Sequence, residues 1–251
     1  TREESDMADV WETFPTQMEE HRAFISFNQS YADIAEKDPR NALLKVRLKL
    51  KQPTPQGLPT NEEFPAISKV EDDLEAAVRG DGGVEVGRVT VNGHRSFYFY
   101  AGFQKSKAME IVATVEKKSA YPLEYVYEQD PKKEGYWKEL YPSADDWQVI
   151  KDLRVLDELR ERGDKPSVSR EVSHWAYFPT RPQAREFANW ATANFYKINA
   201  IEPSKKQFVV RFIHIGTMDL ADITNRTIAI NRKAEELGGD YDGWETSVER
   251  Q

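Results

Sequence analysis

The sequence predicts an α+β protein built from two tandem ferredoxin-like modules, each with the element order β-α-β-β-α-β. Three observations lead to this prediction. The chain has 251 residues, of which 39% are hydrophobic and 31% charged, so it can form two modest cores. From residue 42, strand-like alternation and helix-like spacing of apolar residues follow each other in this order. The same order recurs after about residue 164, without any visible sequence repeat.

The first module is expected to carry an extra N-terminal β-hairpin, with strands over 10–17 and 23–31. Its first central strand shows the clearest pattern, because apolar and cationic residues alternate from Leu44 to Lys51. One face of this strand is therefore buried and the other wet. The remaining elements are a helix with Ile67, Val70, Leu74 and Val78, two strands around the Asn92–Gly93 turn, a helix over 103–118 and a strand over 122–130.

A polar helix over about 143–161 is expected to link the modules, which gives domains over 1–142 and 164–251 with a linker over 143–163. Gly238 and Gly239 end the last helix, since glycine readily adopts the conformation of a helix stop. The elements of the second module are a strand over 168–179, a helix over 180–195, strands over 196–203 and 206–216, a helix over 220–237 and a closing strand over 240–248.

Composition excludes several classes of protein. The absence of cysteine excludes disulfides, thiolate nucleophiles and cysteine-based metal sites, and it fits a reducing cytoplasm. The sequence has no run of eighteen apolar residues, so it predicts no membrane span, and no secretory leader is visible. The net charge of −8 argues against a general nucleic-acid binder. We therefore expect a cytoplasmic protein.

No catalytic motif is present, whether H-E-x-x-H, G-x-S-x-G or a phosphate-binding loop. The four histidines are separated in sequence, and packed or edge histidines are the plain interpretation. His174 and His214 could nevertheless pair in space, because the first and third strands of this fold are neighbours. We expect no catalytic residue, no metal and no cofactor.

The second half of the chain resembles a bacterial family, the regulator of RNase E activity B (RraB) family. The similarity covers about residues 150–251 and is carried by "GGDYDGWET", with Tyr241 to Trp244 as its most specific part, and by "EVSHWAYFPTRPQAREF". The first half is similar to an uncharacterised bacterial domain family, through "PTPQGLPTNEE", "GRVTVNGHRSFYFY" and "YWKELYPSADDW". The resemblance implies a ferredoxin-like regulatory domain that binds a protein, which in the named family is a ribonuclease that becomes inhibited.

The first hypothesis is therefore a non-enzymatic regulator that binds a protein partner through the open sheet face of the second module. The strand over 206–216 supports it, because it is apolar on both faces and something must cover the second face. That cover could be the first module, a second copy of the chain in a homodimer, or a partner such as a ribonuclease. The residues expected on this surface are Trp175, Phe212, His214, Tyr241, Asp242 and Trp244.

The second hypothesis is an RNA-binding accessory role for the first module. Cations beside aromatic rings on an open sheet are typical of single-strand RNA recognition. The net charge disfavours this role, and packing of the same face against another element is the plain alternative. The residues concerned are Lys45, Arg47, Lys49, Tyr98 and Tyr100.

The third hypothesis is an enzyme with a site between the two modules, where clefts often form. It requires two or more of His174, His214, Asp240 and Asp242 to meet in a deep pocket.

Overall fold

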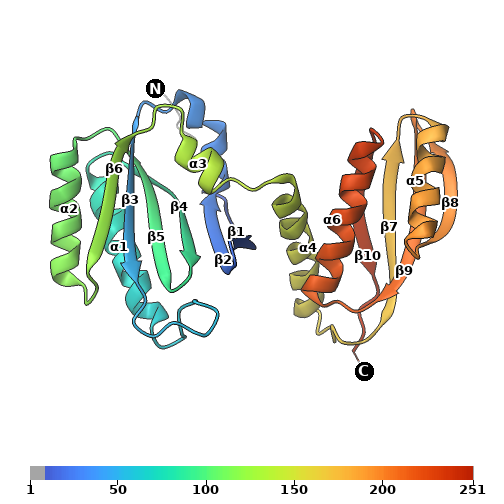
Figure 1. Ribbon diagram of the computed structural model, residues 1–251, viewed down its shortest axis with the longest axis horizontal. Helices are drawn as coiled ribbons and strands as arrows, with labels where there is room; N and C mark the ends of the chain where they lie inside the picture. The colour runs from blue at the N-terminus through green and yellow to red at the C-terminus, as the bar shows by residue number, and fades with distance from the viewer. Residues whose placement is uncertain (1–8, 251) are drawn as a thin grey trace. The chain divides into compact units, whose positions relative to one another are not determined.

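The computed structural model describes residues 9–250, which fall into two compact units divided between Pro142 and Ser143 (Figure 1). Each unit contains an antiparallel sheet with helices on it, as the sequence predicts. Among the residues that the structure describes, no helix is both long enough and apolar enough to cross a membrane.

The first unit contains the predicted β-α-β-β-α-β order with ferredoxin-like topology. Its four strands pair in the spatial order β4-β5-β3-β6, and α1 and α2 pack on one face over a core that includes Leu44, Val46, Phe97 and Phe99. The elements are β3 (Ala42–Lys49), α1 (Phe64–Gly80), β4 (Val84–Val91), β5 (His94–Ala101), α2 (Lys105–Lys118) and β6 (Leu123–Gln129).

The predicted N-terminal hairpin extends this sheet. It consists of β1 (Trp11–Met18) and β2 (His21–Asn28), and β2 pairs with β4, so the complete order is β1-β2-β4-β5-β3-β6. In Figure 1 the hairpin continues the sheet beyond β4. Two short 3₁₀ helices, η1 (Gln29–Asp33) and η2 (Ala35–Lys37), connect it to β3.

A short helix that the sequence did not predict, α3 (Glu134–Glu139), follows β6. It lies over the sheet face opposite to α1 and α2, where Tyr136 and Leu140 are fully buried. Six residues are too few for a helical period to be visible in the sequence, so the pattern gave no signal.

The second unit has the same topology, with strands in the order β10-β7-β9-β8. α5 and α6 pack on one face and share a core with it that includes Ala176, Phe187, Val210 and Phe212. The elements are β7 (Arg170–Phe178), α5 (Arg181–Ala193), β8 (Lys197–Ser204), β9 (Gln207–Gly216), α6 (Leu220–Glu236) and β10 (Asp240–Thr246).

The helix expected as a linker, α4 (Ala144–Glu161), belongs to the second unit. Ser143 and Asp146 cap its start reciprocally, each side chain accepting from the other's backbone N–H. Its apolar stripe packs beside α6, and Leu159 shares a small core with Val172, Ile223 and Trp244. α4 is therefore a third helix of this unit, held by its packing against α6 and the small core around Leu159.

Candidate functional site

The closing strand β10 turns both of its aromatic side chains toward the helices. Tyr241 and Trp244 would face opposite sides of a regular strand. A β-bulge between Tyr241 and Gly243, where Gly243 has φ +122, shifts the register by one residue. This bulge brings both rings to the same face.

A close approach explains the second glycine of the "GGDYDGWET" segment. A Cβ atom on Gly239 would lie 2.4 Å from ring atoms of Phe178, a core side chain of β7. Glycine is therefore required for β10 to reach its place beside β7.

Tyr241 is the end of a buried hydrogen-bonded chain through both histidines of the sheet. Its hydroxyl lies 2.8 Å from His174 Nδ1, and His174 Nε2 lies 2.8 Å from His214 Nδ1. β7 and β9 are neighbours, so the spatial histidine pair suggested by the sequence is confirmed. His174 is 0% exposed and His214 5%.

Both imidazoles are neutral at physiological pH. Burial, with a smaller contribution from the charge of Arg226, lowers the pKa of His214 to about 4. Burial and the neighbouring His214 lower the pKa of His174 well below its ordinary value. Among the described residues, no group of three or more metal-ligating side chains forms, so the pair has no third ligand there. Its geometry is that of a neutral internal hydrogen-bond network.

Trp244 is held by a second buried network, centred on Asp152 of α4. Trp244 Nε1 and Gln148 Nε2 donate to Asp152 Oδ1 at 2.8 and 2.9 Å, and Thr227 Oγ1 donates to Oδ2 at 2.5 Å. Asp152 is fully buried, and burial raises the pKa of its carboxyl. These bonds tie α4 to α6 and β10.

Sequence reasoning missed Asp152. The available signal was its position on the apolar side of a helix, in line with Gln148, Val155 and Leu159 at helical spacing. A carboxylate in such a row is usually one that has buried hydrogen-bond donors.

The expectation that six residues form one exposed surface on the second module is wrong for four of them. Phe212, His214, Tyr241 and Trp244 are between 0% and 8% exposed and lie on the helix-covered face. Successive side chains of a strand point to opposite faces of the sheet, so these four residues cannot share a face with Trp175. Trp175 and Asp242 remain accessible, because Trp175 is partly buried and Asp242 is exposed.

The opposite face of this sheet, called here the open face, is defined by alternate residues of β7 and β9. Within the unit, α5 and α6 pack on the other side of the sheet. Arg211 lies beside Trp175 in the register and forms an ion pair with Glu202 of β8. A hollow of about 200 Å³ lies beside Trp175, and Ile215 is 63% exposed at the end of β9. The residues of the open face are Ser173, Trp175, Tyr177, Val209, Arg211, Ile213 and Ile215. Val209 and Ile213 are buried, at 8% and 7% exposed, so the accessible side chains are Arg211 and Ile215 and, in part, Ser173, Trp175 and Tyr177.

Exposed carboxylates border the open face. Asp240, Asp242 and Glu245 lie on β10, which is an edge strand, and Glu171 lies on β7. Asp240 is paired in the register with Tyr177, and Glu245 with Ser173. This edge of the face is therefore acidic. Because the aspartates are exposed and the histidines buried on the opposite face, these four residues do not form a common acid–base site.

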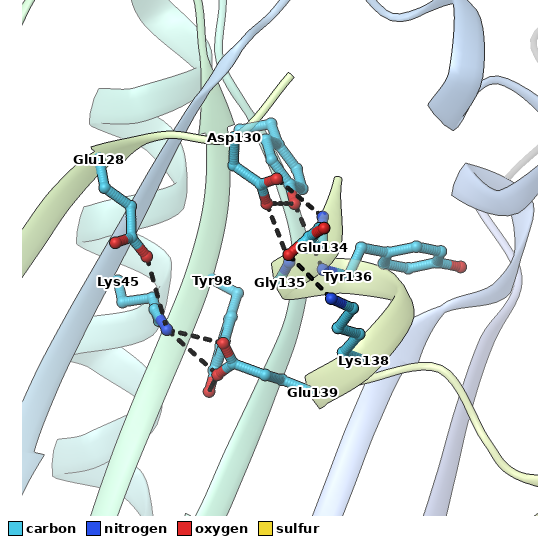
Figure 2. Close-up of polar contacts among 10 residues, drawn as sticks. Lys45, Tyr98, Glu128, Asp130, Glu134, Gly135, Tyr136, Lys138 and Glu139 are labelled. Atoms are coloured by element: carbon cyan, nitrogen blue, oxygen red, sulfur yellow. Dashed lines mark hydrogen bonds and ion pairs between the residues drawn. The ribbon is translucent and has the colours of Figure 1, made fainter. Parts of the chain in front are cut away.

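In the first unit, α3 covers the face that the RNA hypothesis requires. Lys45 and Tyr98 are cross-strand neighbours, as predicted, but both contact Glu139 of α3 (Figure 2). Lys45 Nζ lies 2.8 Å from Glu139 Oε1, and the Tyr98 hydroxyl donates to Oε2 at 2.9 Å. Tyr98 and Tyr100 are 6% and 0% exposed, so neither ring is available for base stacking, although Arg47 and Lys49 are exposed.

Asp130 fixes the start of α3 over this face. Its carboxylate accepts from the Tyr100 hydroxyl at 2.6 Å and from the backbone N–H groups of Glu134 and Gly135 at 2.8 Å each (Figure 2). Burial alone would raise the pKa of Asp130, but these hydrogen bonds hold it below its ordinary value. Helix α3 of the same unit therefore covers the sheet face that carries Tyr98 and Tyr100.

Comparison with known proteins identifies both halves of the chain. Residues 9–141 match a family of unknown function, DUF695, and residues 150–246 match the family described as regulator of ribonuclease activity B. No curated protein matches the chain.

Two solved structures show weak similarity. An unknown protein from Galdieria sulphuraria is 11% identical over 83% of this chain and 99% of its own, with a TM-score of 0.23. A putative glycine cleavage system transcriptional repressor is 7% identical over 82% and 98%, with a TM-score of 0.24. Similarity at this level indicates nothing about function. Each of the two family matches falls within one of the units described above, and because the DUF695 match covers more than half of the chain, the chain belongs to the DUF695 family, while residues 150–246 are similar to the regulator of ribonuclease activity B family.

Proposed function

We propose that this protein is a non-enzymatic regulator that binds a ribonuclease through the open face of its second unit. The family match over residues 150–246 supports this proposal most strongly, because it includes all strands of that sheet and the helices packed on it. The proposed setting is the cytoplasm of a bacterium, in keeping with the family resemblance.

The acidic edge supports a basic partner. Ribonucleases hold the RNA backbone with cationic side chains. Strand β10 presents the carboxylates of Asp240, Asp242 and Glu245, for which no ion pair is seen among the described residues. Glu171 on β7 adds a fourth carboxylate beside them. Such a surface attracts a cationic patch and would compete with RNA for it.

Trp175 supplies the central apolar contact of the proposed interface. Tryptophan is enriched among residues that dominate binding energy, particularly when a pocket lies beside it. The hollow next to Trp175 can receive a partner side chain, and Ile215 extends the apolar area. A second copy of the chain on this face would instead produce a homodimer, which sedimentation of the pure protein would reveal.

A co-purification followed by an inhibition assay tests the proposal. A ribonuclease that co-purifies with the tagged chain is identified, purified and assayed on a fluorescent RNA. The intact chain should slow cleavage, and Trp175→Ala should weaken inhibition at least tenfold. Phe195→Ala is the matched control, because Phe195 is 93% exposed but follows α5 on another part of the unit. Absence of any ribonuclease, or equal inhibition by Trp175→Ala, would contradict the proposal.

A further inference from the structure

A pocket in the first unit lies where the sheet continues past α1. β2 and β1 extend the helix-bearing face beyond this helix, and a pocket of about 300 Å³ forms there. Its polar and aromatic lining comes from four strands and the start of α1: Thr13, Phe24, Ser26, Arg88, Thr90, Arg95 and Phe64.

Strand register assembles the polar side of this pocket. Thr13 pairs with Ser26, and Ser26 pairs with Arg88, so these three side chains form one row across β1, β2 and β4. The Thr13 and Ser26 hydroxyls are 2.6 Å apart. In the next row, Thr90 lies between Phe24 and Arg95. The pocket therefore has hydroxyl groups, two guanidinium groups and the Phe24 ring on adjacent rungs, and Phe64 at the start of α1 adds a second ring.

Arg95 is the unusual member of this lining. It is only 6% exposed, and its Nε donates to Thr90 Oγ1 at 2.9 Å. Its buried Nη1 atom has no hydrogen-bond partner and lies 3.9 Å from Glu71 Oε2. Phe64 lies against the guanidinium, with the ring centroid 5.7 Å from Cζ. A buried charged donor without an acceptor is costly unless a ligand supplies one.

The charges around Arg95 leave an excess of one cation. Glu71 forms its short ion pair with Arg88 and is the acidic group that faces both arginines. Glu85 lies near the same groups, but burial and the charge of Glu71 raise its pKa to about 8, so it is mostly neutral at pH 7. Burial and the charge of Arg88 lower the pKa of Arg95 to about 10, so Arg95 remains charged.

We propose that this pocket binds a small molecule with one carboxylate group and an apolar body. The carboxylate accepts from the free guanidinium edge of Arg95 and from the Ser26 and Thr13 hydroxyls, while Phe24 and Phe64 contact the apolar body. A single negative charge balances the excess cation, whereas a phosphate dianion would add a second charge close to Glu71. The volume lies at the lower end of small-molecule sites, which are about 300–1,000 Å³.

Titration of the full chain with benzoate, followed by the Arg95 Nε–H resonance in NMR spectra, tests this site. Benzoate should shift this resonance in a saturable way, and acetate should bind at least tenfold more weakly because it lacks the apolar body. Arg95→Met removes the charge and keeps the stem, so it should weaken benzoate binding at least tenfold. Binding to this variant is followed on the backbone resonance of Thr90. Arg79→Met, at an exposed arginine of α1, is the matched control and should bind as the natural chain does.

A second variant separates loss of the site from loss of the fold. Phe24→Leu, assayed in the same way, should weaken benzoate several-fold and leave acetate unchanged, with the backbone spectrum intact. Absence of a saturable shift, undiminished binding in Arg95→Met, or inorganic phosphate binding more tightly than benzoate would each overturn the proposal. None of these results depends on the ribonuclease assay, because the pocket and the open face belong to different units.

Discussion

The two units share one topology and differ in the face of the sheet that lies opposite the paired helices. In the first unit α3 covers it, and Glu139 and Asp130 satisfy the lysine and tyrosine side chains beneath. In the second unit the corresponding face carries Trp175 and the exposed Ile215 with an acidic border. The six-residue helix α3 therefore covers this face in the first unit, whereas in the second unit the same face is accessible at Arg211 and Ile215 and partly at Trp175. Fold class alone does not indicate which surface of a module is used.

The units also differ in the polar groups that they bury. The second unit buries a neutral histidine pair and the Asp152 network. The first buries Glu85 and Arg95, each with an atom that lacks a hydrogen-bond partner. Among the described residues, the second unit has such an atom only in Arg170, whose Nε is unpartnered while both Nη atoms donate to Asp164. In the Asp152 network every donor has its acceptor, and the network holds α4 in place. Arg95, by contrast, keeps an N–H donor that a ligand can use. The following predictions test this contrast, from the largest expected effect to the smallest.

Asp152→Ala should lower the free energy of unfolding of the second unit by about 4 kcal/mol, because three buried donors lose their acceptor. Hydrogen exchange measured by mass spectrometry should show faster exchange in α4 and β10, with the first unit unchanged. Asp157→Ala, at an exposed residue of the same helix, is the control and should change stability by less than about 0.5 kcal/mol. If both variants behave alike, the Asp152 network does not hold α4.

Asp130→Ala should lower the free energy of unfolding of the first unit by about 3 kcal/mol, since it removes the acceptor of Tyr100 and of two backbone N–H groups. Hydrogen exchange should accelerate in α3 and the second unit should be unaffected. Glu134→Ala, at an exposed side chain of the same helix, serves as the control. Unchanged protection of α3 in the Asp130 variant would show that other contacts hold it.

Acidification from pH 7.5 to 5 should change the stability of the two units in opposite directions. The folded pKa of His214, about 4, lies below its ordinary 6.5, so the unfolded second unit binds more protons and its stability falls, by about 2 kcal/mol at pH 5. The folded pKa of Glu85, about 8, lies above its ordinary 4.5, so the folded first unit binds more protons and its stability rises by about 3 kcal/mol. The raised pKa of Asp152 opposes the histidine effect at the acid end of this range.

Hydrogen exchange resolved by unit, measured at both pH values, checks these signs. Glu85→Gln should remove most of the rise in the first unit, and His214→Gln should reduce the fall in the second. Parallel changes in both units would show that the buried groups do not govern the pH dependence.

Ile215→Lys should change the stability of the second unit by less than about 0.5 kcal/mol, because this side chain is 63% exposed on the open face. Val210→Lys, on the same strand but fully buried, should prevent the unit from folding. Thermal unfolding of both variants distinguishes the two faces of β9. A large loss of stability in Ile215→Lys would mean that the open face is covered in the free protein.

Much of this architecture could be predicted from sequence patterns. Alternation around Val46 and helical spacing from Leu220 to Leu237 predicted the order of the elements. The faces were harder to assign. The alternation along β9 shows that Phe212 and His214 share one face. Because β9 is apolar on both faces, the pattern does not indicate which face the helices cover. α3 is too short to show a period, and its contacts with Lys45 and Tyr98 join residues far apart in sequence.

The pocket beside Arg95 also had no signal in the sequence. Thr13, Ser26 and Arg88 come from three strands, and only the added hairpin and its register bring them into one row. Nothing in the local pattern distinguishes Arg95 from the cations that alternate along other strands. Such a site depends on tertiary pairing, which a single sequence does not specify.

Charge reversal at the acidic edge tests the central claim most directly, namely that the open face of the second unit binds the ribonuclease. The dissociation constant is measured by calorimetry for Asp242→Lys/Glu245→Lys and for Glu186→Lys/Glu235→Lys. The second pair lies on α5 and α6 and changes the net charge equally. We predict at least a tenfold weakening for the β10 pair and a much smaller effect for the helix pair. Equal weakening by both pairs, or unchanged binding in the β10 pair, would contradict the claim.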